Sequence, residues 1–318
     1  MAFRKWLLTA LLPLMFVATA VAADEEGENK IPPPPKGALK YTIMVQSFEN
    51  KAGWGGRWSI GEGMTEVMTD MLKQSGWFTV LGDAQMRKAA MQEQDFGASG
   101  RVIQGKKTPK MGRMTPAQLL LKGAITNVQE TKSGGGGINF MGVSIGGKGG
   151  SAEINFTVYL VNAETGQVVA SKSIVGKSGR RGFRIGYYGS DLGGLTGRFG
   201  GESRDNVMEA AENALGQALA FIVKQLDTIP WEGTVILKKG NTLIVNRGER
   251  DGVSVGRVFG VGTMEQLIDP DTGEVLDIDM NRVGTAKVVR VKKKIAYLKP
   301  LENGDQMQKG MSIFPLDQ

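Results

Sequence analysis

Two glycine-rich segments in the middle of the chain place the strongest limit on its fold. Residues 132–158 and 176–202 alternate apolar residues with polar residues or glycine, which is typical of β-hairpin arms. Glycine weakens an ordinary buried strand because it contributes no side chain to the core. Strands that cross a bilayer need only about 9 to 11 alternating residues, and both segments have arms of roughly this length. We therefore expect either membrane-crossing hairpins or glycine-rich surface flaps.

In the membrane interpretation, the apolar members of each alternation face lipid. These residues are Ile138, Phe140, Val143, Ile145, Ile154, Phe156, Phe183, Ile185, Tyr187, Leu195 and Phe199. A nucleotide-binding loop is the disfavoured alternative. Residues 142–149 end in glycine where a phosphate loop needs serine or threonine, and residues 171–179 begin with serine in place of the first glycine. Neither segment precedes a helix, which such a loop requires.

The N-terminus predicts export. Residues 1–23 carry Arg4 and Lys5, then an apolar run too short for a spanning helix, then small residues up to Ala23, which is the order of a cleavable signal peptide. Residues 24–39 are first acidic and then rich in proline, so we expect an extended arm that is either a tether or a strap. The sequence has no cysteine, which argues against disulfide bonds and a cysteine-linked lipid anchor.

Composition argues against an enzyme. The sequence has no histidine, the commonest general base and metal ligand, and we expect no catalytic residue, no metal and no cofactor. The acidic residues of 268–279 have the spacing of a turn between two strands rather than of a catalytic or calcium site. The formal net charge of +7 would suit nucleic acid, but an anionic membrane surface or an acidic exported partner is the expected counterpart of an exported chain.

Hydrophobic periodicity predicts two domains. Residues 40–227 are expected to form an α/β (α+β) domain with the two glycine-rich hairpins inserted in it. After the boundary sequence DTIPW, residues 231–318 contain short strands separated by glycine and turn residues, which indicates a small all-β barrel of the SH3-like kind. The expected helices of the first domain are 61–76, a second that begins after the cap Asp83, and 203–226, and its main strands are 40–48, 119–130, 151–162 and 166–176.

The order of four short sequences resembles the curli secretion channel (CsgG) family over residues 40 to about 226. They are YTIMVQSFEN (41–50), IGEG (60–63), SGWFTVL (75–81) and NAETG (162–166). The resemblance implies periplasmic α/β domains that associate in a homo-oligomeric ring. It also implies that each subunit contributes two hairpins, at 132–158 and 176–202, to one outer-membrane barrel.

The same resemblance points to a pore constriction. In that family the loop after the first strand narrows the pore, and the corresponding segment here is 50–61. The resemblance therefore implies that Trp54 and Trp58 constrict the pore, with Asn50 and Arg57 beside them. This loop is shorter than the family's loop and does not match it residue by residue. The alternative is that both tryptophans pack on the neighbouring helix.

Two departures from that family keep a second function open. The family's lipidated cysteine is absent, and the family lacks a C-terminal barrel. The barrel sequence GNTLIVNRGERDGVSVGRVF (240–259) resembles the C-terminal domain of the flagellar H-ring assembly protein T family. The first expectation is a ring-forming pore or assembly platform in the periplasm and outer membrane of a Gram-negative bacterium, serving a surface fibre or adhesin as exported cargo. The second is a soluble periplasmic scaffold for an appendage such as the flagellum, with its hairpins outside lipid.

Overall fold

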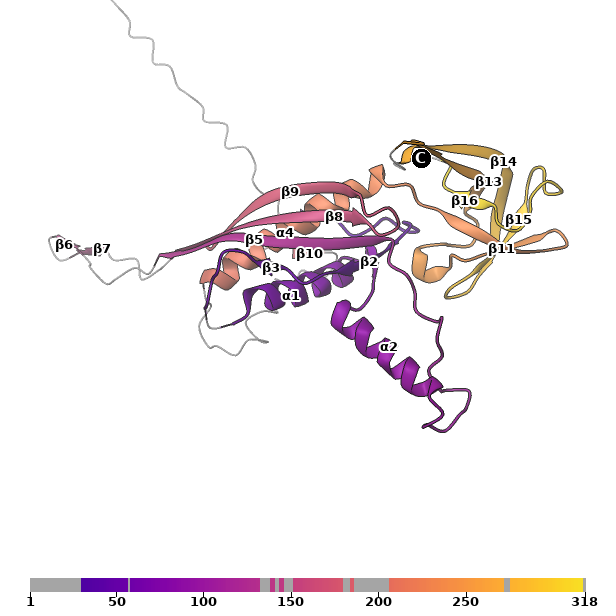
Figure 1. Ribbon diagram of the computed structural model, residues 1–318. Helices are drawn as coiled ribbons and strands as arrows, with labels where there is room; N and C mark the ends of the chain where they lie inside the picture. Colours follow the sequence, from indigo (N-terminus) through magenta and orange to yellow (C-terminus); the bar gives the residue numbers. More distant parts are fainter. Residues whose placement is uncertain are drawn as a thin grey trace, which may run out of the picture.

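The computed structural model shows an α/β domain followed by a closed β-barrel (Figure 1). The residues it describes are 30–56, 58–131, 138–140, 143–145, 151–179, 184–185, 206–271 and 275–316. The predicted signal peptide, residues 1–23, lies outside these ranges. The predicted combination of an α/β domain and an all-β barrel is confirmed.

Six strands form the sheet of the first domain. They are β2 (Tyr41–Val45), β3 (Glu49–Asn50), β4 (Phe78–Val80), β5 (Leu119–Thr131), β8 (Ser151–Asn162) and β9 (Val168–Lys177). The strand order is β4-β2-β5-β8-β9, and β3 pairs with β5. β2 runs parallel to β4 and β5, whereas β8 runs antiparallel to both β5 and β9. The three long strands therefore form an antiparallel meander beside a short parallel part.

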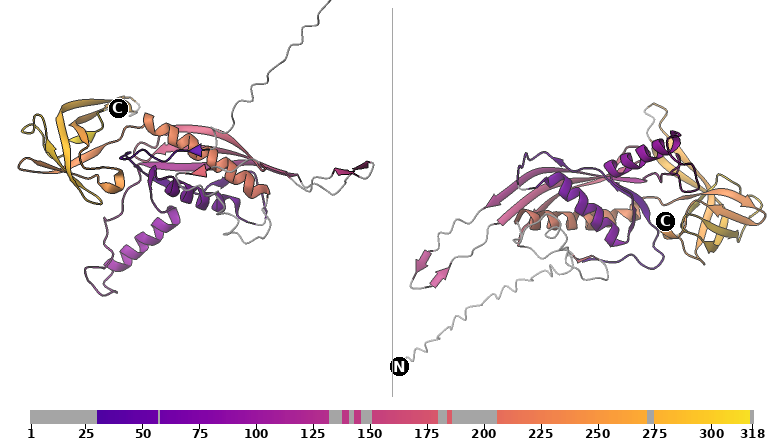
Figure 2. Two further views of the ribbon diagram at one scale, coloured as in Figure 1. Left: turned by 180° about the vertical axis from the view of Figure 1, so that it is seen from behind. Right: turned by 90° about the horizontal axis from the view of Figure 1, so that it is seen from below.

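Helices α1 (Ile60–Ser75) and α4 (Asn206–Gln225) cover one face of this sheet (Figure 2). Their apolar residues recur at helical spacing, and the predicted stripe of α1 is buried from Met64 to Leu72. Small residues let α4 approach the sheet closely. A Cβ on Gly176 of β9 would lie 2.1 Å from the carbonyl oxygen of Ala210, so only glycine fits this contact.

Helix α2 (Ala84–Ala98) stands away from the rest of the domain (Figure 1). It begins after Asp83, whose side chain accepts a hydrogen bond from the Met86 backbone amide at 2.8 Å, as the sequence predicts. Gly97 is the helix's one buried residue. The sheet and α1 therefore complete their core without α2.

The second domain is a closed barrel of strand order β11-β12-β15-β14-β13-β16. Its strands are β11 (Gly233–Lys239), β12 (Thr242–Val245), β13 (Val258–Ile268), β14 (Val275–Val291), β15 (Ala296–Pro300) and β16 (Ser312–Phe314). A short 3-10 helix, η1 (Leu226–Thr228), precedes the barrel, and a second, η2 (Glu249–Asp251), lies between β12 and β13. Because the barrel body is closed, it has no free strand edges. A small domain of this kind therefore does not pair with the strands of other molecules in water.

The first predicted hairpin is partly wrong in its bounds. β6 (Ile138–Phe140) and β7 (Val143–Ile145) pair antiparallel, but the return arm was expected to run to residue 158 as lipid-facing strand. Residues from Ser151 onward instead belong to β8 of the domain sheet. Ile154 and Phe156 are 0% and 1% exposed in the domain core, so the prediction that they face lipid is wrong. Their inward side is covered by helices rather than by lipid.

The second predicted hairpin contains a pairing that the sequence does not suggest. β10 (Arg184–Ile185) runs parallel to β1 (Lys30–Ile31), with Ile185 opposite Ile31. Part of this segment is thus attached to the N-terminal arm. Phe183, Tyr187, Leu195 and Phe199 lie outside the described residues.

Candidate functional site

Three connections leave the same end of the sheet, which we call the hairpin end. Thr131 of β5 is opposite Ser151 of β8, so the connection 132–150 begins and ends there. Lys177 of β9 is opposite Glu153, which places the start of the second glycine-rich connection at the same end. The parallel pairing of Asn50 with Ile125 directs the following loop, 51–59, to this end as well. The barrel lies at the opposite end of the sheet (Figure 1).

The loop at the hairpin end is held by its own side chains. The Asn50 side-chain amide donates to the Trp54 carbonyl oxygen at 2.8 Å, and the Trp54 amide donates to Asn50 Oδ1 at 3.3 Å. The rings of Trp54 and Trp58 meet edge to face, with 5.5 Å between their centroids. A Cβ on Gly56 would lie 1.9 Å from the Trp54 ring, so the indole covers the backbone at that point. The predicted site residues Asn50, Trp54 and Trp58 therefore form one structured turn.

Both tryptophans are half-buried and pack against the core of the α/β domain. This packing agrees with the alternative interpretation of the sequence, in which the rings serve the fold. A role in narrowing a pore stays a prediction for the exposed part of the rings. Arg57, the fourth residue of the predicted constriction, lies outside the described residues.

A charged group beside this loop was not recognised in the sequence. Glu49 forms ion pairs with Lys51 at 3.3 Å and with Lys122 at 3.4 Å. Hydrogen bonds from Lys51 and Lys122, together with their positive charges, lower the pKa of the Glu49 carboxyl. The strand pairing of β3 with β5 brings Lys122 to Glu49 across a long stretch of sequence, so no local motif signals the contact.

Replacing Glu49 by glutamine is expected to lower stability at neutral pH and to leave it unchanged in acid. Because the folded-state pKa is lowered, the ionised carboxylate contributes stability above the pKa of about 4.3 that glutamate has in an unfolded chain. That contribution is lost as the pH falls through the lower folded-state pKa. Urea unfolding of wild type and Glu49→Gln should therefore differ at pH 7, differ less in high salt, and converge as the pH falls below the pKa of about 4.3 that glutamate has in an unfolded chain. A difference independent of pH would contradict this assignment.

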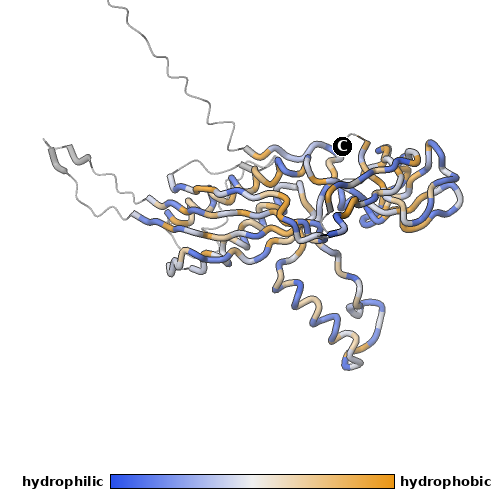
Figure 3. Tube along the Cα trace, turned by 45° about the horizontal axis from the view of Figure 1, so that its top comes forward, coloured by the Kyte–Doolittle hydropathy of each residue, from blue (hydrophilic) through white to orange (hydrophobic). Residues whose placement is uncertain are grey.

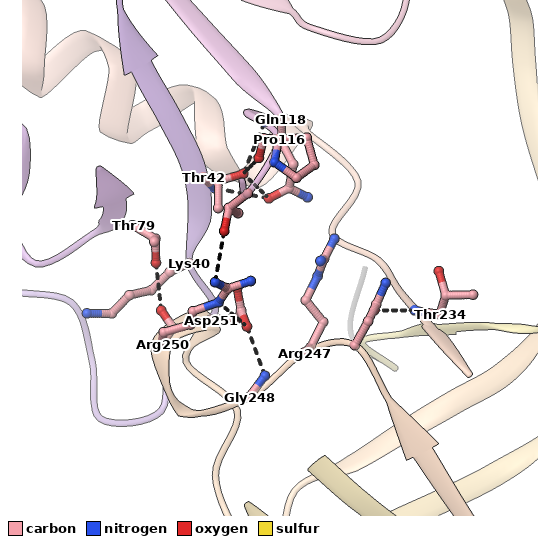
Figure 4. Close-up of polar contacts among 12 residues, drawn as sticks. Lys40, Thr42, Thr79, Pro116, Gln118, Thr234, Arg247, Gly248, Arg250 and Asp251 are labelled. Atoms are coloured by element: carbon pink, nitrogen blue, oxygen red, sulfur yellow. Dashed lines mark hydrogen bonds and ion pairs between the residues drawn. The ribbon is translucent and has the colours of Figure 1, made fainter. Parts of the chain in front are cut away.

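At the other end of the sheet, the barrel is docked on the α/β domain by polar contacts of one loop (Figure 4). The Lys40 amide donates to the Asp251 carbonyl oxygen at 3.0 Å, and the Thr79 hydroxyl donates to the Arg250 carbonyl oxygen at 2.7 Å. The Arg250 guanidinium donates to the Thr115 hydroxyl at 3.1 Å. The buried Asp251 carboxylate accepts from the Gly248 amide at 2.9 Å. Gly248, Arg250 and Asp251 belong to the segment 240–259, whose flagellar resemblance stays a prediction, and the loop that contains them joins the two domains.

A tryptophan completes this junction. Trp231 is 1% exposed, and its ring stacks on Phe259 of the barrel at 5.5 Å between centroids. Its indole NH donates to the carbonyl oxygen of Lys40 at 3.3 Å. The guanidinium of Arg247 lies 5.8 Å from the ring centre, and burial is the main cause of the lowered pKa of Arg247. One continuous apolar cluster therefore runs from the sheet into the barrel.

The described part of the proline-rich arm, residues 30–39, is a strap rather than a tether. Ile31 is 1% exposed, and the Trp77 indole NH donates to the Pro32 carbonyl oxygen at 2.9 Å. Further along, the Arg257 guanidinium of the barrel donates to the Gly37 carbonyl oxygen. A Cβ on Gly252, whose φ is +81°, would lie 1.9 Å from the Ala38 carbonyl oxygen. The strap thus contacts both domains.

The described residues contain no group of three or more histidine, cysteine, aspartate or glutamate side chains placed to hold a metal ion. Among the helices of that part of the chain, none is long and apolar enough to cross a membrane.

Several solved structures are similar to part of this chain at low identity and low TM-score. The PelC dodecamer from Paraburkholderia phytofirmans is 15% identical with a TM-score of 0.31, covering 59% of this chain and 90% of that chain. A hypothetical protein from Chlamydia trachomatis is 11% identical with a TM-score of 0.33, and the match covers 58% of this chain and 96% of that chain. A lipoprotein from Neisseria meningitidis is 13% identical with a TM-score of 0.26, and the match covers 59% of this chain and 99% of that chain.

No curated protein matches the chain. The family resemblance predicted from the sequence is nevertheless confirmed, with somewhat wider bounds. Over residues 29–239, more than half of its length, the chain matches the family described as curli production assembly/transport component CsgG, and it belongs to that family.

Proposed function

We propose that this protein is an exported, non-enzymatic subunit of a homo-oligomeric ring, which acts as an outer-membrane secretion pore or assembly platform for a surface fibre or adhesin. Membership of a family of assembly and transport components supports the role in secretion. The observation that carries the proposal is the convergence of the loop 51–59 and both glycine-rich connections at the hairpin end of the sheet. In a ring of parallel subunits, these segments of every copy face the same side.

Lipid accepts strands only when all their backbone groups are paired, which requires a closed barrel without edges. One copy supplies too few strands for that closure, whereas a ring of copies that each add hairpins supplies enough. β5 and β8 are paired up to Thr131 and Ser151, with one register shift between Ile125 and Asn127, so they offer a base from which a longer hairpin extends. No cofactor and no nucleic acid take part in this function, and the envelope of a Gram-negative bacterium is its location.

A soluble periplasmic scaffold for an appendage is the second candidate. The pairing of β10 with β1 favours it, because this pairing holds Arg184 and Ile185 beside the strap instead of beside a hairpin partner. In this function the hairpins stay outside lipid, and the barrel binds the appendage.

The deciding experiment is extraction of the full chain from a Gram-negative host, followed by measurement of its native mass. The pore requires detergent for extraction and yields a large oligomer, whereas the scaffold is released by osmotic shock. A matched variant replaces residues 132–150 by Asn-Gly, since Thr131 and Ser151 are directly opposite and a two-residue turn can join them. We expect this variant to fold and to lose much of its dependence on detergent. Release of the wild type as a soluble small species would overturn the pore proposal.

A further inference from the structure

The arm built from α2 and the loop after it, residues 84–113, exposes more apolar surface than its own domain explains. We call it the α2 arm. No described helix or strand packs extensively against α2, and the arm mainly folds back on itself, with Gln104 donating to the Gly97 carbonyl oxygen at 2.8 Å. Its exposed apolar side chains are Met86 (60%), Met91 (49%), Phe96 (46%), Ile103 (96%) and Met111 (57%). Such a concentration of exposed apolar side chains marks a surface that a partner covers.

The α2 arm is also strongly basic. It has seven lysine and arginine residues against two acidic ones, a formal charge of +5. Lys106, Lys107 and Lys110 lie together in the loop and are exposed. Figure 3 shows hydrophilic and hydrophobic positions interspersed along the arm. A partner for this surface therefore combines apolar side chains with acidic ones.

The barrel carries a surface of that chemistry. Residues 263–271 and 275–281, which we call the acidic hairpin, comprise the parts of β13 and β14 that extend beyond the barrel and the described residues next to them. β16 pairs with β13 only from Gly260 to Gly262, and β15 pairs with β14 only from Ala286 onward. No described strand pairs with this extension as a third strand, and a two-stranded ribbon is marginally stable in water unless something packs on it.

The acidic hairpin complements the α2 arm in charge and in apolar content. Its described residues include five acidic side chains and no basic one, a formal charge of −5. Glu265, Asp271 and Asp279 are exposed. Its exposed apolar side chains are Leu267 (50%), Ile268 (54%), Leu276 (64%) and Met280 (38%). Both surfaces belong to the same chain, which makes a second copy the partner that fits both.

The two surfaces are separate parts of the molecule. In Figure 1 the α2 arm extends below the body and the acidic hairpin lies along its top, both near the junction of the two domains. Two different patches form a head-to-tail contact, which closes into a ring when the rotation between copies allows it. We propose that the α2 arm of one copy docks on the acidic hairpin of the next copy in the ring. This inference rests on the proposed ring and assigns its contact surfaces.

Charge reversal on each surface tests the contact. One variant carries Lys106→Glu, Lys107→Glu and Lys110→Glu, and a second carries Glu265→Lys, Asp271→Lys and Asp279→Lys. We expect each to raise the protein concentration needed for assembly on the order of a hundredfold, because like charges then face each other across the interface. The variant with all six changes is expected to assemble again, since the charges are complementary once more. Native mass of the full chain at several concentrations is the measurement.

A matched control carries Lys239→Glu, Lys299→Glu and Lys309→Glu, three exposed lysines on the barrel outside both surfaces. It changes the net charge as the first variant does and should assemble like wild type. All changes are on the surface, so unchanged thermal melting verifies the fold. A wild type that is a monomer would overturn the proposed ring itself. A wild-type ring that both reversals leave intact, or that the sixfold variant does not restore, would overturn only this interface.

Discussion

Replacing Trp231 by alanine is expected to lower the free energy of unfolding by about 3–5 kcal/mol, the usual cost of removing a fully buried aromatic ring. The ring is 1% exposed and stacks on Phe259 of the barrel. Its loss also leaves the Lys40 carbonyl oxygen without the hydrogen bond that the indole NH donates. Urea unfolding of the full chain measures the change.

Trp77→Ala is the matched control for this prediction. Trp77 is only half-buried and contacts the strap rather than the barrel, so its removal is expected to cost roughly 1–2 kcal/mol. If both variants lost the same free energy of unfolding, burial at the junction would not explain the contribution of Trp231 to stability.

The Trp231 variant is also expected to change the form of the unfolding curve. The apolar cluster is continuous between the domains, which favours a single transition in the wild type. Without the ring, the junction keeps mainly the polar contacts of Arg250 and Asp251 and the contacts of the strap, and the barrel and the α/β domain should unfold in two steps. Tryptophan fluorescence and circular dichroism report different parts of the chain, so their curves should separate in the variant alone.

The parts of the fold that the sequence predicts correctly are those with local signals. The apolar stripe of α1 and the cap at Asp83 depend on residues within a few positions of each other, and both are found as expected. The barrel was recognised because turn residues separate its strands at regular intervals, and closure follows from strand pairing. Local spacing carries this information because helix and strand periods are fixed by backbone geometry.

The prediction for Ile154 and Phe156 failed because periodicity does not identify what a strand face contacts. An alternating strand has the same pattern whether its apolar side meets lipid or the helices of its own domain. Here the residues that cover the apolar face of β8 are distant from it in the sequence. α4 packs on β8, and Phe48 contacts Phe156 with 5.3 Å between ring centroids. The junction around Arg250 escaped prediction for the same reason, because Thr79 and Thr115 reach it only through the fold.

Replacing Trp54 and Trp58 together by alanine is expected to raise the single-channel conductance of the assembled protein in lipid. In the proposed ring, every copy presents these rings at the hairpin end, so truncation widens the opening at many points at once. The stability cost should be roughly 1–2 kcal/mol for each ring, because both are only half-buried against the core. Conductance in planar bilayers, together with urea unfolding, separates the effect on the pore from the effect on the fold.

Trp77→Ala serves as the control here too, because Trp77 is a half-buried tryptophan at the opposite end of the sheet, between α1 and β4. It should lose comparable stability for its single ring and leave conductance unchanged. If the double variant at the hairpin end conducts like wild type while it loses stability, the two rings serve only the packing of the loop. That result would move the proposed constriction to the glycine-rich connections and would not contradict the proposed ring or its hairpins.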